Sequence, residues 1–236
     1  RSLRRGDGNH PGAAAERVLL VGLGKDAELS DKSYREVIRS ALRAVAQTGA
    51  DDATLFLLEV PVKARDAAWK AEHTALIAGE CTYRFENFKG TPDRNNAVLK
   101  HIALAVSDKA EQAAVDAALH AGEAMAEGIA FAKDLGNTPP NVCTPAFLAD
   151  AARRMGKSHG LKVEVLEQKE MEKLGMGSLL SVSMGSRNPP KFIILQHNGG
   201  KKGEKPVVLV GKGITFDTGG ISIKPAPDMD EMKYDM

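Results

Sequence analysis

The chain has 236 residues, 43% of them hydrophobic and 27% charged, and these fractions are those of a soluble globular protein. Its 32 basic and 31 acidic residues give a formal net charge of +1, so the composition supports neither a polybasic membrane patch nor a nucleic-acid partner. No stretch approaches the ~18 consecutive apolar residues that a membrane-spanning helix needs. The length allows one large domain or two ordinary ones.

Cysteine content and the first residues bear on the compartment. Cys81 and Cys143 are too few and too far apart for a disulfide framework or a cysteine-based zinc site, which indicates a reducing environment. The chain starts at Arg1, and residues 1–12 contain no apolar segment of the kind that a signal peptide carries. We therefore expect a cytoplasmic protein whose true start is missing.

The first part of the chain alternates strand-like and helix-like segments. Residues 17–24 form an apolar run that ends in glycines and predicts a strand, and further strands are predicted over residues 53–58 and 100–106. From Ser33 onward the apolar residues recur at helical spacing, with Ser33 and Glu36 as a possible capping box. Gly49 is expected to end this helix. The order predicts parallel strands in a smaller α/β domain over residues 1–108.

A long alanine-rich segment divides the chain. Residues 110–135 contain no proline and predict one long helix, which the sequence around Pro139 and Pro140 ends, so residues 109–137 are expected to link two domains. Beyond the link, the pattern predicts helices over residues 145–157 and 169–174. Strands are predicted over residues 162–166, 191–197 and 206–210. Residues 138–236 therefore read as the opening, incomplete part of a second α/β domain.

Three candidate functional signals are weaker than their structural alternatives. Residues 22–27 match G-x-G-x-x-A, but the helical pattern starts only after a polar loop, so a strand-end turn is favoured over a dinucleotide site. Cys143 has no visible base nearby and is interpreted as a packing residue rather than a nucleophile. The six histidines are scattered without a zinc-binding pair, and His197 is interpreted as a polar residue at a strand edge.

The last residues of the chain carry the strongest functional signal. Lys212 and Asp217 follow the apolar run 206–210, which is expected to be a buried strand, and Gly219-Gly220 allows the backbone to approach a ligand closely. Side chains at the carboxyl ends of such strands line the ligand crevice of open α/β sheets. A solvated loop is the expected role of the other charged residues around the motif: Lys201, Lys202, Lys205, Asp228, Asp230, Glu231 and Lys233.

The chemistry of this motif favours a divalent metal ion. Asp217 and Asp235 lie 18 residues apart and can converge from different loops on one cation. A lysine in such a site is either a neutral nitrogen ligand or a cation that polarises a carbonyl. Hydrolysis is the natural reaction, because water bound to a metal ion is an activated nucleophile.

At this point a known family is identifiable. G-K-G-I-T-F-D-T-G-G-I-S-I-K-P at 211–225 and M-D-E-M-K-Y-D-M at 229–236 resemble the leucyl aminopeptidase family, the cytosol aminopeptidases with two metal ions. K-D-L-G-N-T-P-P-N at 133–141 and L-G-M-G-S at 174–178 support the resemblance, which extends over residues 17–236. It implies a smaller N-terminal α/β domain, a long linker helix and the opening part of an α/β/α metallopeptidase catalytic domain.

The resemblance also implies roles for individual residues. Asp217 is similar to the carboxylate that bridges both metal ions, while Lys212 and Asp235 are similar to ligands of one of them. Lys224 resembles the catalytic lysine that binds the substrate carbonyl, and Met232 matches a residue of the substrate pocket. The implied cofactors are two divalent ions, Mn²⁺ or Zn²⁺ with Mg²⁺ or Co²⁺ as alternatives. The implied substrate is a peptide with Leu or a similar residue at its N-terminus, and the implied assembly is a homohexamer.

One part of the family pattern is absent. The remaining metal ligands belong to a later segment resembling N-T-D-A-E-G-R, which these 236 residues do not contain. Three ligands cannot complete two metal sites that each take about four to six donors. Two hypotheses stay open: a metal-dependent aminopeptidase of which this chain carries half the site, and an inactive fragment or an assembly or ligand-binding module.

Overall fold

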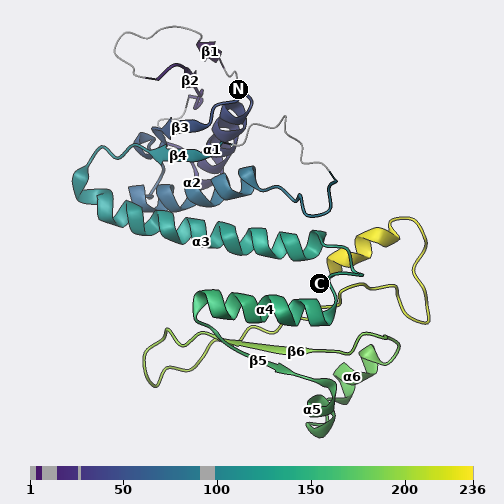
Figure 1. Cartoon of the computed structure of the whole chain (residues 1–236). Helices are drawn as coiled ribbons and strands as arrows, with labels where there is room; N and C mark the ends of the chain where they lie inside the picture. Colours follow the sequence, from purple (N-terminus) through teal and green to yellow (C-terminus); the bar gives the residue numbers. More distant parts are fainter. Residues whose placement is uncertain (1–3, 7–14, 26–27, 91–98, 236) are drawn as a thin grey trace. The chain divides into compact units, whose positions relative to one another are not determined.

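A computed structural model of the chain describes residues 4–6, 15–25, 28–90 and 99–235. The chain divides into two compact units, Arg1–Ala132 and Lys133–Met236, and both contain helices and strands, so the predicted α/β class is confirmed (Figure 1). Most of the predicted linker helix falls in the first unit by this division. The predicted domain limits at residues 108 and 138 stay predictions.

The described residues of the first unit form two small strand pairs and three long helices, the third of which ends in the second unit. β1 and β2 are antiparallel, and β3 and β4 are parallel with Asp52 opposite His101. The described elements are β1 (Arg4–Gly6), β2 (Val18–Leu20), α1 (Asp31–Ala46), β3 (Asp52–Leu55), η1 (Leu57–Glu59), α2 (Ala67–Thr82), β4 (His101–Leu104), η2 (Lys109–Glu111) and α3 (Gln112–Asn137).

Three predictions for this unit need correction. The predicted strand over residues 53–58 ends at Leu55, because the chain turns into the 3-10 helix η1. The parallel connection runs from β3 to β4 through α2, a helix that the sequence pattern did not reveal. The cap of α1 is Ser30 and not Ser33, since the Ser30 hydroxyl accepts the N–H of Ser33 inside the first turn at 3.2 Å.

The core of the first unit is built around α1. Its predicted apolar face is buried, and Gly49 follows its end with a φ of 72°, as expected. Tyr34 is fully buried and donates its hydroxyl to the carbonyl of Leu57 at 3.2 Å, which satisfies the one polar atom on this face. The main cluster of buried residues comprises Leu29, Tyr34, Val37, Ile38, Leu42, Val45, Leu55, Leu57, Val62, Ile77 and Leu99.

Glycine residues let α2 and α3 approach each other closely. A Cβ atom on Gly122 of α3 would lie 2.3 Å from the Glu72 carbonyl oxygen of α2, and one on Gly79 would lie 2.4 Å from the Ala126 Cβ. Real Cβ atoms do not occupy such positions, so any larger residue at Gly122 would force the two backbones apart.

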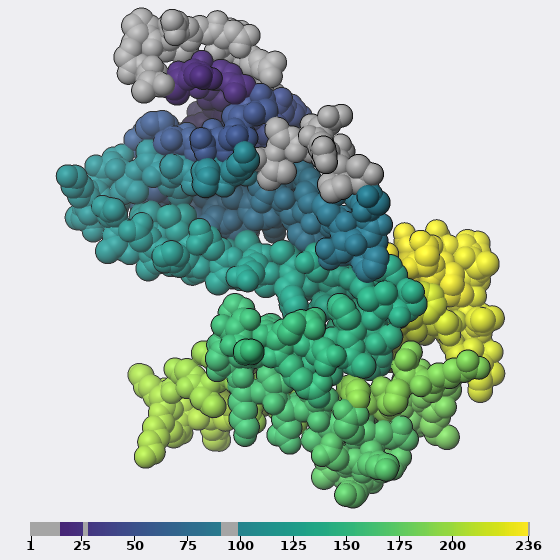
Figure 2. All heavy atoms as spheres, in the orientation of Figure 1, coloured from purple at the N-terminus to yellow at the C-terminus, as the bar shows by residue number. Residues whose placement is uncertain are grey.

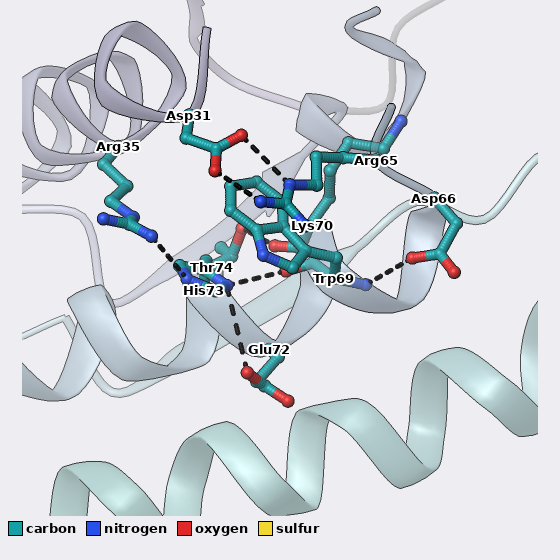
Figure 3. A network of polar contacts seen from close by, with 9 residues as sticks. All are labelled: Asp31, Arg35, Arg65, Asp66, Trp69, Lys70, Glu72, His73 and Thr74. Atoms are coloured by element: carbon teal, nitrogen blue, oxygen red, sulfur yellow. Dashed lines mark hydrogen bonds and ion pairs between the residues drawn. The ribbon is translucent and has the colours of Figure 1, made fainter. Parts of the chain in front are cut away.

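A polar network joins the N-terminal turns of α1 and α2 (Figure 3). Arg65 donates two hydrogen bonds to Asp31, at 3.1 and 2.7 Å, and its guanidinium lies 4.8 Å from the centre of the Trp69 ring. The imidazole of His73 stacks on Trp69 with ring centres 4.0 Å apart. Arg35 donates to Nε2 of His73 at 3.1 Å, so Nδ1 of this imidazole carries the hydrogen that reaches the Trp69 carbonyl.

The described residues of the second unit form the end of α3, three further α-helices, the 3-10 helix η3, one antiparallel strand pair and a long irregular segment. α4 begins after Thr144, whose hydroxyl caps the N–H of Phe147, and ends at Gly160 with a φ of 67°. The predicted strand over residues 162–166 is confirmed. The described elements are the C-terminal residues of α3 followed by α4 (Pro145–His159), β5 (Lys162–Leu166), α5 (Gln168–Lys173), α6 (Gly177–Ser183), β6 (Phe192–Gln196) and η3 (Met229–Asp235).

The predicted buried strand over residues 206–210 is wrong for the structure of this chain. No strand is assigned there, and the side chains of Val207, Leu209 and Val210 are 90, 92 and 90% exposed. An apolar run becomes a buried strand only where other strands pair with it and other elements cover its faces. The described residues supply neither. Among the described helices, α3 included, none is long and apolar enough to cross a membrane.

Candidate metal centre

A tight turn shapes the centre of the C-terminal motif. Gly219 and Gly220 have φ values of 90° and 69°, and a Cβ atom on Gly219 would lie 2.4 Å from the Ser222 carbonyl oxygen. Only glycine fits this position without strain. The Lys224 N–H donates to the Thr218 carbonyl at 2.8 Å and closes the turn. The turn therefore brings Asp217 and Lys224 to the same side of the loop.

Three of the predicted site residues meet in one cluster. The ammonium of Lys224 lies 3.1 Å from Oδ2 of Asp217 and 3.1 Å from the sulfur of Met232. The Met232 carbonyl accepts the Asp217 N–H at 3.4 Å, which holds η3 beside the turn. The C-terminal segment lies at the surface of the second unit, as the yellow atoms of Figure 2 show.

Asp217 is the electrostatic centre of this cluster. The Gly219 N–H donates to its Oδ1 at 2.9 Å, and Lys224 occupies Oδ2. The Gly219 N–H, then the Lys224 ammonium and a hydrogen-bonding contact with Asp235, hold the pKa of the Asp217 carboxyl below its usual range. The convergence of Asp217 and Asp235 on one cation stays a prediction.

Lys212 is the predicted site residue that the structure does not bring into the cluster. Its side chain is exposed, and among the described residues it makes no hydrogen bond or ion pair. It follows the exposed segment 206–210, so nothing in the described part of the chain fixes its position.

The residues present fit a divalent ion in chemistry and fall short in number. Carboxyl groups such as those of Asp217 and Asp235 attract cations. In this structure the cation beside Asp217 is the Lys224 ammonium. Oxygen donors of this kind suit hard and borderline divalent ions. Within the described ranges, however, no group of three or more His, Cys, Asp or Glu side chains could hold a metal ion. The described residues of the cluster thus offer fewer donors than a divalent ion takes.

Other candidate residues take structural places. Cys143 is 1% exposed, and burial raises the pKa of its thiol, which agrees with the packing interpretation. Sequence reasoning missed Tyr234, whose hydroxyl donates to Oδ1 of Asn137 at 3.1 Å. Both residues lie inside segments that carry the family resemblance, but nothing in the sequence pairs positions that are 97 residues apart.

Comparisons with known proteins identify the family. A model of the cytosol aminopeptidase family, catalytic domain, matches residues 130–236, and a model of the N-terminal domain of the same family matches residues 8–92. A probable cytosol aminopeptidase of Methylobacillus flagellatus is 54% identical over 226 residues, which are 96% of this chain and 46% of the relative. One of Nitrosospira multiformis is 55% identical over 231 residues, 97% of this chain and 45% of the relative.

Solved structures agree with this assignment. The bottromycin maturation enzyme BotP in complex with Mn is similar over 99% of this chain and 46% of its own length, with a TM-score of 0.77 and 28% identity. The matched segments are those of a peptidase family with separate N-terminal and catalytic domains. The chain belongs to the cytosol aminopeptidase family, and it spans about half the length of the curated relatives it matches.

Proposed function

We propose that this chain carries the N-terminal part of a metal-dependent aminopeptidase that releases Leu and similar residues from the N-terminus of peptides. The observation that carries the proposal is the cluster of Asp217, Lys224 and Met232 within the segment that matches the catalytic-domain model. The names of the curated relatives support the reaction class. They also support a cytoplasmic location, and the family resemblance favours a homohexamer.

In this proposal the carboxyl groups hold the metal ions. Asp217, Asp235 and Lys212 are the residues that would hold the divalent ions. When bound, the ions would polarise the peptide carbonyl and activate water. Mn²⁺ is the first choice, because the similar enzyme BotP was solved in complex with Mn, and Zn²⁺ is the second.

Lys224 is assigned the role of the electrophile. Its ammonium lies 3.1 Å from Oδ2 of Asp217, so its charge would stand beside the ions that Asp217 would hold. A fixed positive charge there stabilises the negative oxygen that develops on the substrate carbonyl. Met232 places an apolar surface beside the ammonium, which suits an apolar first side chain of the substrate.

The small number of donors supports a second candidate, a chain that assembles or binds ligands without catalysing hydrolysis. Because no complete donor set occurs among the described residues, the 236 residues alone are expected to be inactive. One experiment separates the two candidates. The remaining segment of the Methylobacillus flagellatus relative is fused after Met236, and both this joined protein and the chain alone are assayed on leucine amide with Mn²⁺.

We expect hydrolysis by the joined protein and none by the chain alone. Lys224→Ala in the joined protein should lower kcat roughly 10²-fold or more, because it removes an oxyanion stabiliser. Lys205→Ala, an exposed lysine outside the cluster, is the matched control and should change kcat less than about threefold. If Lys224→Ala also stays within about threefold, the role of Lys224 is wrong. No hydrolysis by the joined protein would favour the second candidate.

A further inference from the structure

The segment with two of the proposed site residues has few attachments to the rest of the second unit. η3 carries Met232 and Asp235 and has no buried residue. Its backbone reaches the turn through the bond between the Asp217 N–H and the Met232 carbonyl, which at 3.4 Å is long. A ligand segment held this loosely would not keep a carboxylate in place.

Tyr234 attaches this segment to a second point. Its hydroxyl donates to Oδ1 of Asn137, the last residue of α3, at 3.1 Å. A Cβ atom on Gly136 would lie 3.5 Å from the Tyr234 ring, so the ring rests over the backbone at the end of this helix. The ammonium of Lys233 also lies near the ring, 4.9 Å from its centre.

Tyr234 lies between the two functional residues of η3. Met232 is two positions before it and Asp235 directly follows it, so a fixed Tyr234 ring limits how far either can move. Asn137 in turn is held at the end of a helix and directly precedes Thr138, which is buried and donates its hydroxyl to the Asp134 carbonyl. Asn137 therefore adjoins a buried, hydrogen-bonded residue, whereas no residue of η3 is buried.

We infer that Tyr234 is a positioning residue, which holds Asp235 and Met232 at the metal centre through its hydrogen bond to Asn137. The inference rests on the proposed function for what the centre binds, but the attachment itself does not. Residues that do not bind the metal ion themselves can still set the orientation of its ligands. Loss of such a residue typically lowers metal affinity or activity about 10- to 100-fold.

The test uses Tyr234→Phe, which removes one hydroxyl and keeps the ring. Hydrogen exchange of residues 229–235 is measured in the 236-residue chain without metal, and we expect it to become roughly 2- to 10-fold faster. Tyr83→Phe makes the same chemical change in the first unit and should leave exchange in η3 unchanged. Asn137→Asp keeps an acceptor oxygen and should preserve slow exchange in η3, whereas Asn137→Leu should accelerate it. Adding Tyr234→Phe to Asn137→Leu should cause no further increase in the exchange rate.

A second measurement concerns the metal. In the joined protein, Tyr234→Phe should weaken Mn²⁺ binding about 10-fold or more, as measured by calorimetry. Its melting temperature should equal that of the joined protein without the substitution. If hydrogen exchange of η3 is equally fast in the unsubstituted 236-residue chain and in its Tyr234→Phe variant, the hydrogen bond to Asn137 does not attach η3. Faster exchange with unchanged Mn²⁺ affinity would overturn the positioning role. If the joined protein neither binds Mn²⁺ nor hydrolyses leucine amide, the proposed function is wrong, and Tyr234 then positions no metal ligand. The hydrogen-exchange result still decides whether Tyr234 attaches η3 to Asn137.

Discussion

The two units differ in how far they bury their apolar side chains. In the first unit, strands and helices enclose a cluster around Tyr34 and Ile38, both fully buried. In the second unit, the run 206–210 is almost fully exposed, and Ile221 and Ile223 beside the Gly219-Gly220 turn are exposed as well. The first unit thus buries its apolar residues with its own described residues, while the part of the second unit that carries the proposed site does not.

The comparison teaches that the buried core and the proposed site belong to different parts of this chain. Burial of apolar surface contributes about 25 cal/mol per Å², so an exposed run of four apolar residues contributes little to folding. The site residues lie directly after this run and on η3, which is attached by few hydrogen bonds. Substitutions should therefore reduce stability most in the first unit and function most in the second.

The largest expected effect sharpens this contrast with one substitution type at two sites. Leu42→Ala removes a side chain that is 3% exposed and should lower the free energy of unfolding by about 2–5 kcal/mol. Leu209→Ala removes one that is 92% exposed and should change it by less than about 0.5 kcal/mol. Urea unfolding, followed by circular dichroism and by the fluorescence of Trp69, measures both. Equal losses at the two sites would remove the contrast.

Alkaline pH should destabilise the first unit through Tyr34. Burial raises the pKa of the Tyr34 hydroxyl from 10.0 to about 12, although a hydrogen bond with Thr74 opposes the shift. Because the folded pKa is the higher one, this stabilisation is complete below about pH 10 and is lost as the pH rises toward 12, a loss of roughly 3 kcal/mol. The free energy of unfolding of Tyr34→Phe should fall less steeply over this range. Parallel curves would show that Tyr34 does not titrate as its burial implies.

Two glycines of α3 test the close contact within the first unit. Gly122→Ala places a methyl group against the Glu72 carbonyl and should destabilise the protein by about 1–3 kcal/mol. A methyl group on Gly128 would meet no other atom within 4 Å, so Gly128→Ala should stabilise α3 by up to about 1 kcal/mol. Thermal unfolding distinguishes the two variants. A stabilising Gly122→Ala would mean that the helices lie further apart than described.

The smallest expected effect concerns the exposed pair of Asp31 and Arg65. The hydrogen bonds from Arg65 hold the pKa of the Asp31 carboxyl below its usual range. The folded pKa is the lower one, so the pair stabilises the folded protein at neutral pH, and this contribution disappears as the pH falls through the folded pKa. In Arg65→Gln, NMR titration should return the Asp31 pKa toward its usual range. An unchanged pKa would assign the shift to other groups.

The sequence predicted elements well where local pattern and end signals agree. The alanine-rich helix α3, with its proline stop, and α4, with Thr144 before Pro145, formed close to their predicted limits. The sequence pattern did not predict α2. The buried face of that helix includes small and polar residues, among them Lys70 and Thr74, so its apolar residues do not recur at helical spacing. Lys70 is buried there because its ammonium donates to the carbonyls of Leu58 and Val60.

Contacts distant in sequence set the remaining limit. The motif brought Asp217 and Lys224 together because one short turn connects them, and that turn could be read from two glycines. The wrong prediction of a buried strand at 206–210 could not be recognised locally, since the burial of such a run depends on partners elsewhere. The pair of Tyr234 and Asn137 was equally invisible, because neither side chain signals its partner.

The central claim is that the cluster around Asp217 and Lys224 is part of a two-metal site that this chain does not complete alone. Calorimetric titration with Mn²⁺ tests it most directly. The joined protein should bind two ions per chain, and Asp217→Asn should abolish this binding, whereas the 236-residue chain should not bind two ions tightly. Tight uptake of two ions by the 236-residue chain alone would contradict the claim.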